Sequence, residues 1–258
     1  MRDIQNEEDP RRIEIDKVGV KGLSYPIIVL DRANKLQHTV AKVNMFVNLP
    51  HSFRGTHMSR FVEILNQYRG QITMKNMGPI LKRMREVFQA ESAHLEIDFP
   101  YFIEKEAPVS RAKSLMSYMC KFIGSLSKGE DFVLEVRVPV NTLCPCSKEI
   151  SDRGAHNQRG EVRLQVRFKE FVWIEDLISL VEASASSGLY SLLKREDERW
   201  VTENAYDNPA FVEDVVRSLA DKLLKDPNIT WFSVEAENQE SIHNHNAYAF
   251  LERESGGD

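Results

Sequence analysis

The chain has 258 residues, 42% of them hydrophobic, and a formal net charge of −5, so it can bury a substantial core as one large or two small domains. The acidic balance leaves no basic excess that would draw nucleic acid through phosphate neutralisation. No apolar run approaches the roughly 20 residues of a membrane span, and the charged start MRDIQNEEDPRRIEID is unlike a secretory signal, so we expect a cytoplasmic protein with no membrane partner.

The first half of the chain begins with a segment of mixed character. Residues 1–36 combine charges, a proline and the short apolar run PIIVL, and we interpret them as an N-terminal arm packing on the body. A half-buried strand is predicted over residues 43–49, where apolar residues alternate with polar ones. Two segments with helical spacing and then two strands follow, at residues 61–65, 80–88, about 92–103 and about 113–126.

The second half begins after the turn SKGED with an alternating strand over residues 134–140. Its hairpin partner is EVRLQVRF, in which every second residue is apolar. One helix is predicted over Ile174–Val181, and Asn208 as a cap with Pro209 in the first turn predicts another. ITWFSVEAE and HNAYAFLE close this half as strands.

The order of elements in the second half is strand, strand, helix, helix, strand, strand, and the first half approximately echoes it. No helix separates consecutive strands in the manner of a parallel sheet. We therefore expect an α+β protein built from two antiparallel sheet and helix-pair units in tandem, at residues 37–129 and 130–258.

Side chains that can bind a metal crowd into four short segments of the second half. The segments hold Cys144 and Cys146 in LCPCSKEIS, His156 in RGAHNQRG, Glu198 in KREDERW, and His243 and His245 in SIHNHNAY. Three cysteines in the whole chain cannot form a disulfide framework. A single one of these residues is as well explained as an ordinary loop or buried residue, but thiol, imidazole and carboxylate clustered together favour a metal site.

A structural zinc finger is the rival interpretation of paired cysteines and paired histidines. Such motifs usually separate their cysteines by two to four residues and their histidines by three to five, whereas one residue separates each pair here. We therefore expect only one cysteine to bind the metal directly.

Several of these segments resemble the signature segments of GTP cyclohydrolase IB, namely LCPCSKEIS, GAHNQRG, SIHNHNAYA, RGTHMSRF and PVSRAKS. The resemblance covers nearly the whole chain. It implies the tunnelling fold, in which antiparallel sheets with helix pairs on one face join across subunits into a barrel, and it implies a homotetramer. The implied activity is opening of the guanine ring of GTP, with release of formate and formation of 7,8-dihydroneopterin triphosphate for folate-type pterin synthesis.

The resemblance also implies a divalent metal ion (zinc, manganese or iron) and no organic cofactor. The ion would be held by Cys144, His156 and Glu198, with His243 as a further ligand in some metal states, and would make hydroxide available to attack C8. His243 and His245 would shuttle protons. The role of Cys146 stays open between orienting the loop and binding the metal transiently when substrate is absent.

Substrate contacts are implied on both halves of the chain. Glu213 is either a first-turn glutamate favoured by the helix dipole or, as the resemblance implies, the anchor for the guanine edge. The candidates for the triphosphate are His57, Arg60, Arg111, Lys113, Lys148 and Arg159. Residues of the first half are expected to reach the site of a neighbouring subunit.

Two alternatives to this function come from the same observations. One is a different tunnelling-fold enzyme that acts on a pterin or deazapurine, and the other is a non-catalytic assembly protein stabilised by zinc. Some relatives stop at a cyclic phosphate, which leaves the final product open as well.

Overall fold

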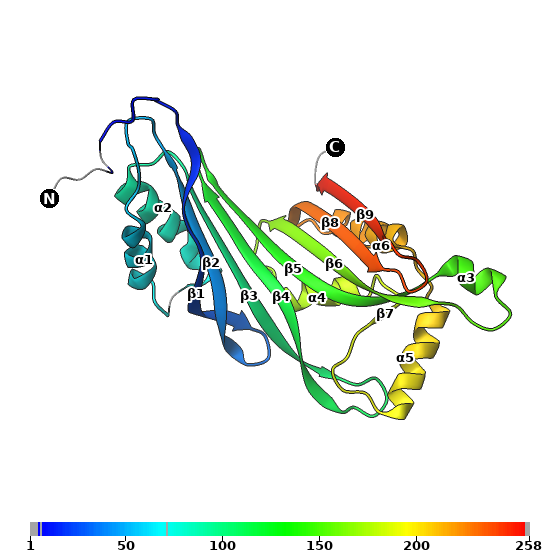
Figure 1. Cartoon of the computed structure of the whole chain (residues 1–258). Helices are drawn as coiled ribbons and strands as arrows, with labels where there is room; N and C mark the ends of the chain where they lie inside the picture. The colour runs from blue at the N-terminus through cyan, green and yellow to red at the C-terminus, as the bar shows by residue number, and fades with distance from the viewer. Residues whose placement is uncertain (1–4, 6, 71, 256–258) are drawn as a thin grey trace. The chain divides into compact units, whose positions relative to one another are not determined.

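A computed structural model describes residues 5, 7–70 and 72–255 of the chain (Figure 1). The strands pair in the order β1-β2-β3-β4-β5-β6-β8-β9, and the short β7 pairs with β5. Helices lie between antiparallel strands, so the α+β prediction is confirmed. The chain divides into two compact units: Met1–Pro100 with Lys121–Leu134, and Tyr101–Cys120 with Glu135–Asp258.

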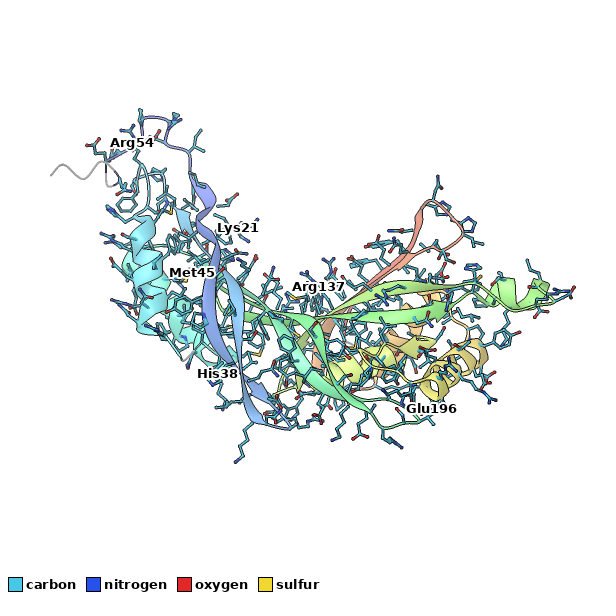
Figure 2. All side chains as sticks on the ribbon, turned by 60° about the horizontal axis from the view of Figure 1, so that its bottom comes forward. Lys21, His38, Met45, Arg54, Arg137 and Glu196 are labelled. Atoms are coloured by element: carbon cyan, nitrogen blue, oxygen red, sulfur yellow. The ribbon has the colours of Figure 1, made fainter. Side chains whose placement is uncertain are left out.

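The first unit contains a strand pair, a helix pair and the beginning of a second strand pair. Its elements are β1 (Ile15–Asp31), β2 (Lys35–Leu49), α1 (Met58–Gln67), the 3-10 turn η2 (Met74–Asn76), α2 (Met77–Phe88), and parts of β3 (Ala93–Glu106), β4 (Lys113–Leu126) and β5 (Glu130–Leu143). Helices α1 and α2 contact each other, and they contact β1 and β2, as Figure 1 shows. Met45, labelled in Figure 2, is fully buried on β2.

The N-terminal segment differs from the predicted arm. Residues 1–4 and 6 lie outside the described residues, but Ile15–Asp31 form β1, which pairs with β2 from Ile15 opposite Leu49 to Asp31 opposite Lys35. The first half of β1 has mostly exposed or half-exposed side chains and its register shifts twice, so the alternation that identifies a strand is missing there.

The second unit repeats the order of strands and helices with insertions. Its further elements are α3 (Pro145–Ile150), β6 (Asn157–Phe168), α4 (Ile174–Glu182), β7 (Ser187–Gly188), α5 (Arg195–Asp207), α6 (Val212–Leu224), β8 (Ile229–Gln239) and β9 (Asn246–Glu254). Helices α4 and α6 contact β6, β8 and β9. The alternating segment EVRLQVRF lies within β6, and its Val162, Leu164 and Val166 are fully buried. The predicted strand is therefore confirmed.

One helix prediction in this unit is wrong, and one helix was not predicted. Asn208 does not open a helix: it is the C-terminal cap of α5, and α6 begins at Val212 after Phe211. Helix α5 has no apolar stripe, because only Asp197 and Ala205 are buried in it, and this is why periodicity does not predict it. Its first-turn Glu196 is exposed (Figure 2).

Within the described part of the chain, no helix is both long and apolar enough to cross a membrane.

Candidate active site

A cavity of about 420 Å³ in the second unit brings together many of the polar residues that the sequence singles out. It is lined by Cys144, His156, Gln158, Phe211, Val212, Glu213, Asn238, Glu240, His243, His245, Ala247 and Tyr248. These residues come from the end of β5, the start of β6, the start of α6 and the β8–β9 turn. Strand ends and a helix start therefore meet at one place, with thiol, imidazole and carboxylate groups around it.

Cys144 follows directly on β5 and is the N-terminal cap of α3. Its Sγ accepts a hydrogen bond from the Ser147 N–H at 3.4 Å, and its own N–H donates to the His156 carbonyl at 3.1 Å. This pairing across the β5–β6 connection explains how residues twelve apart share the cavity. Cys146 is exposed and does not line the cavity, so only one of the two thiols faces it.

The orientation of the His156 ring is set by Gln158, a buried residue that the sequence analysis missed. His156 Nδ1 lies 3.1 Å from Gln158 Oε1 and 3.4 Å from Ser241 Oγ. An amide oxygen can only accept, so this pairing places the proton on Nδ1 and leaves Nε2 as a free electron-pair donor. The signal in the sequence is spacing: His156 directly precedes β6 and Gln158 is the second residue of that strand, so the two side chains, two residues apart, can lie on the same side.

His243 and His245 lie in the turn between β8 and β9. Their rings stack with centroids 5.1 Å apart and an interplanar angle of 16°. Both side chains are exposed to solvent as well as lining the cavity. Two solvent-exposed imidazoles that line the cavity could pass protons between its interior and water.

Glu213 is the second residue of α6 and lines the same cavity. The start of α6 is capped by its neighbour, since the Phe211 N–H donates to Asp214 Oδ2 at 3.1 Å. Capping therefore does not require Glu213, which leaves its carboxylate available to a ligand. Phe211 and Tyr248, also missed in the sequence, give the cavity two aromatic rings.

Asn238 forms part of the buried wall of the cavity. Its Nδ2 donates to Thr142 Oγ1 at 2.8 Å, and both residues are buried. Its Oδ1 occupies the space that a Cβ at Gly160 would need, so glycine on β6 makes room for this amide. The hydrogen bond joins β5 to β8 beside Cys144 and fixes one side of the cavity.

Glu198 does not line this cavity. The C-terminal end of α5 is tied to α3, because Lys148 Nζ donates to the Tyr206 carbonyl. Glu198 lies eight residues earlier on the helix, which is about 12 Å along its axis. Across the described ranges, with residues 1–4, 6, 71 and 256–258 set aside, no three His, Cys, Asp or Glu side chains come together as a metal site.

The basic candidates for the triphosphate also lie outside the lining of the cavity. Lys148 stands over the Tyr206 ring, 4.3 Å from its centroid, and Arg159 lies on β6 opposite Gln239. In the β3–β4 hairpin, Arg111 pairs with Glu106 at 3.7 Å and Lys113 with Glu104 at 3.1 Å. His57 caps the start of α1 in the first unit, and the Arg60 N–H donates to its carbonyl at 3.1 Å.

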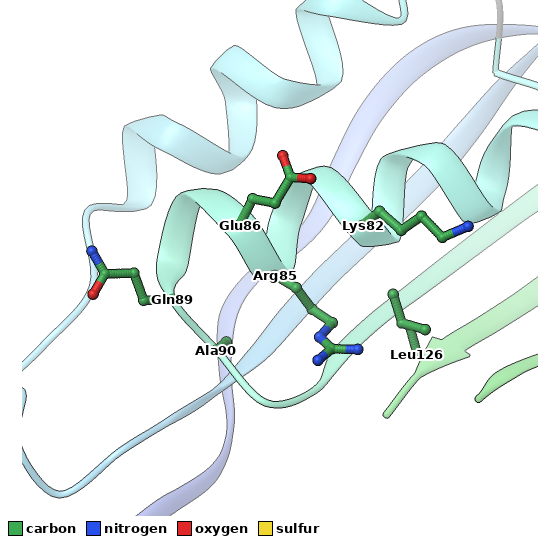
Figure 3. Close-up of a pocket in the computed structure, with 6 residues that line it drawn as sticks. All are labelled: Lys82, Arg85, Glu86, Gln89, Ala90 and Leu126. Carbon is green, nitrogen blue, oxygen red and sulfur yellow. The ribbon is translucent and has the colours of Figure 1, made fainter. Parts of the chain in front are cut away.

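A second cavity, of about 350 Å³, lies in the first unit between α2 and the end of β4 (Figure 3). Its charged groups already have partners in the protein: Lys82 pairs with Glu130 at 2.7 Å, and Arg85 Nη1 donates to the Ser127 carbonyl at 3.0 Å. None of the residues singled out in the sequence lines it.

Comparison with known proteins agrees with the motifs around the first cavity. A family model described as "Type I GTP cyclohydrolase folE2" matches residues 1–249. Among similar proteins, the GTP cyclohydrolase FolE2 of Syntrophotalea carbinolica is 63% identical over 252 residues, which are 98% of this chain and 95% of that protein. The GTP cyclohydrolase FolE2 of Syntrophus aciditrophicus is 62% identical over 98% of this chain and 100% of its own length.

Solved structures with a similar fold are far more distant in sequence. A uricase from Bacillus fastidious has a TM-score of 0.55 at 7% identity, covering 92% of both chains. Urate oxidase from Bacillus sp. TB-90 has a TM-score of 0.54 at 8% identity, covering 93% of this chain and 100% of that one. At these identities the likeness shows a common fold alone.

Proposed function

The chain belongs to the type I GTP cyclohydrolase FolE2 family, and we propose that it converts GTP to a dihydropterin at the cavity around Cys144 and His156. The observation that carries the proposal is that one cavity collects Cys144, His156, Glu213, His243 and His245 from four separate parts of the chain. All three cysteines are free thiols, as is usual for proteins of the reducing cytoplasm, which is the location we propose.

Two of the three implied ligands of a divalent metal ion line this cavity, and the third, Glu198, lies outside its lining. Cys144 offers a thiolate, and the Gln158 contact leaves His156 Nε2 as a donor. Glu198, with His243 in some states, would complete the set. When bound, such an ion would supply an activated water for hydrolysis at C8 of guanine. One thiolate, one imidazole and one carboxylate form a harder set than two thiolates, so manganese and iron suit it as well as zinc.

The other cavity residues serve the substrate. One water adds to C8 and the imidazole ring opens to a formamide, and a second water hydrolyses the formamide so that C8 leaves as formate. The ribose carbons then rearrange and condense with the freed amine, with loss of one water, to close the dihydropterin ring. The ring nitrogens released in these steps need protons, which His243 and His245 are placed to deliver and recover. Glu213 accepts hydrogen bonds from N1–H and the 2-amino group of guanine, while Phe211 and Tyr248 offer apolar faces to the base. The ring-closed product is 7,8-dihydroneopterin triphosphate or its cyclic phosphate.

The same proposal includes assembly into a tunnelling-fold barrel, with a homotetramer as the expected form. It is supported by the fold shared with urate oxidases and by the absence of Glu198 and Arg111, which belong to the same unit, from the lining of the cavity. The strand order leaves β1 and β9 at its two ends, and open strand edges are commonly covered by another chain. A second copy would then supply the missing ligand and phosphate contacts.

Mixing two inactive variants tests whether each active site contains residues from two chains. Cys144→Ala and Arg60→Ala chains, refolded together at a one-to-one ratio, should regain activity in about one quarter of the sites, because random assembly puts both intact residues in one site that often. Activity is measured per site after mixing, with each variant alone as its control. Mixtures as inactive as the separate variants would show that both residues serve the same chain's site.

The role of Gln158 gives a second prediction. Gln158→Leu should weaken metal binding by about 10–100-fold, because the Nδ1–H of His156 loses the partner that holds its ring and tautomer. Gln158→Glu keeps an acceptor at the same place and should bind metal about as well as the parent. Titration with Mn²⁺ measures the metal affinity of the two variants and of the parent protein. Equal affinities for all three proteins would remove Gln158 from the site.

A direct assay separates this function from its alternatives. The purified chain, loaded with metal and incubated with GTP, should give a product that fluoresces as a pterin after oxidation. A zinc-stabilised assembly protein would give none, and an enzyme acting on a preformed pterin or deazapurine would leave GTP intact.

A further inference from the structure

Asp197 is a fully buried carboxylate at the start of α5. Its Oδ1 accepts the backbone N–H groups of Val109 and Ser110, both at 2.8 Å. Its Oδ2 accepts the Ser110 hydroxyl at 2.6 Å and the Lys194 N–H at 2.8 Å. Both oxygens therefore have two partners, as a buried charge requires.

These hydrogen bonds do more than cap a helix. A capping carboxylate needs only the N–H groups at the start of its own helix, which the Lys194 contact satisfies. The other three bonds reach the β3–β4 turn, 87 and 88 residues earlier in the chain.

In the β3–β4 turn that is hydrogen-bonded to Asp197, Arg111 has a strained backbone conformation. Arg111 has φ 59°, a left-handed geometry that costs a non-glycine residue energy and persists only where the surroundings impose it. The Ser110 hydroxyl also accepts a hydrogen bond from the Ala112 N–H at 3.3 Å. The Ser110 side chain therefore restrains the residue before Arg111 and the residue after it. The guanidinium itself is largely exposed.

A second contact ties the same hairpin to the segment before α5. Lys105 Nζ donates to the Leu189 carbonyl and to Glu182 Oε1, both at 2.7 Å, and it stands 4.3 Å from the centre of the Tyr190 ring. The β3–β4 hairpin is thus joined twice to the stretch that leads into α5, at Leu189 and at Asp197.

We propose that Asp197 is a positioning residue that locks the Arg111 turn to the first turn of α5, so that Glu198 and Arg111 are presented at a fixed spacing. The inference rests on the proposed functions of Glu198 as a metal ligand and Arg111 as a phosphate contact. Asp197 touches neither metal nor substrate. It acts on both through the backbone, since Glu198 is its chain neighbour and Arg111 follows Ser110.

The test uses full-length Asp197→Asn and Ser110→Ala proteins. Asp197→Asn should raise the Kd for Mn²⁺ by about 10–100-fold, the usual effect of removing a group that orients a ligand. The KM for GTP should rise in both variants, because Arg111 loses its support. Ser110→Thr keeps the hydroxyl and should restore both values to near those of the parent.

The matched control is Asp31→Asn in the first unit. Asp31 is likewise buried and accepts the N–H groups of Ala33 at 2.9 Å and Asn34 at 2.7 Å. Its variant should lose thermal stability comparably while leaving the Kd for Mn²⁺ and the KM for GTP unchanged. If Asp197→Asn and Ser110→Ala also lower only the melting temperature, Asp197 is a structural residue and the inference is wrong.

Two reference variants distinguish this failure from failure of the proposed site. Glu198→Gln should weaken Mn²⁺ binding at least as much as Asp197→Asn, and Arg111→Ala should raise the KM for GTP. If Glu198→Gln leaves Mn²⁺ affinity unchanged, the proposed ligand set is wrong and Asp197 has no metal ligand to position. If Asp197→Asn does not fold, Ser110→Ala decides alone through its KM and its rescue by threonine.

Discussion

Cys144→Ala should abolish turnover while the protein stays folded. A catalytic metal supplies several kcal/mol of transition-state stabilisation, so losing its thiolate ligand should lower kcat by about 10³-fold or more. Stability should fall by only about 0.5–2 kcal/mol, the usual cost of removing a helix cap, because the Cys144 side chain is partly exposed and accepts one hydrogen bond. Activity, metal content and thermal melting are measured on the same preparation.

Glu149→Ala is the matched control for this experiment. Glu149 lies in α3 five residues after Cys144, is exposed, and does not line the cavity. The control should keep its activity and its metal. A Cys144→Ala enzyme with near-normal turnover, or one that loses activity only because it unfolds, would contradict a metal site at this thiolate.

Glu213→Ala should lower kcat/KM for GTP by a factor that corresponds to about 2–5 kcal/mol, the range for truncating one partner of a charged hydrogen-bonded pair that is buried in the complex. Glu213 is exposed in the free protein, so the bound base would have to bury it. A carboxylate can accept hydrogen bonds from both N1–H and the 2-amino group of guanine. Adenine has neither donor at that edge, so the parent enzyme should reject ATP by a factor of up to about 10⁴–10⁵. ITP keeps the N1 donor and loses the amino group, so it should be a poor but measurable substrate.

The variant should lose discrimination without losing stability or metal. Its neighbour Asp214 already caps α6, so Glu213 contributes at most the roughly 0.3–1 kcal/mol of a first-turn acid. Asp221→Ala, an exposed acid on the same helix, is the control and should leave GTP kinetics unchanged. If Glu213→Ala turns over GTP as efficiently as the parent, or loses metal in place of base selectivity, Glu213 only supports the helix start.

Helices and strands with a regular pattern of apolar residues could be predicted from the sequence. Those that are mostly polar or exposed could not. The strict alternation in EVRLQVRF identifies β6, whereas α5 buries little besides Asp197 and Ala205 and has no stripe for periodicity to detect. Strand β1 is exposed along its first half, so its pairing with β2 decides its structure more than its own pattern does. Asn208 is a good capping residue, but it caps the C-terminal end of α5.

For the site, the motifs predicted both the family and much of the cavity. The GTP cyclohydrolase prediction is confirmed by the family model and by relatives at 60–63% identity over nearly the whole chain. The motif residues Cys144, His156 and His243 meet because each follows or precedes a strand that ends at the same place. Gln158 and Asp197 escaped prediction because their function lies in holding other residues, which only distances reveal.

Metal-dependent release of C8 from GTP at this cavity can be measured by following C8 of the substrate. GTP labelled with ¹³C at C8 is incubated with the chelator-treated chain, before and after a divalent metal is restored, and formate is measured by NMR beside the pterin product. We expect one labelled formate for each dihydropterin formed, only in the metal-restored sample, and none from the Cys144→Ala protein. Consumption of GTP without labelled formate, or equal formate from the metal-free chain, would contradict this expectation.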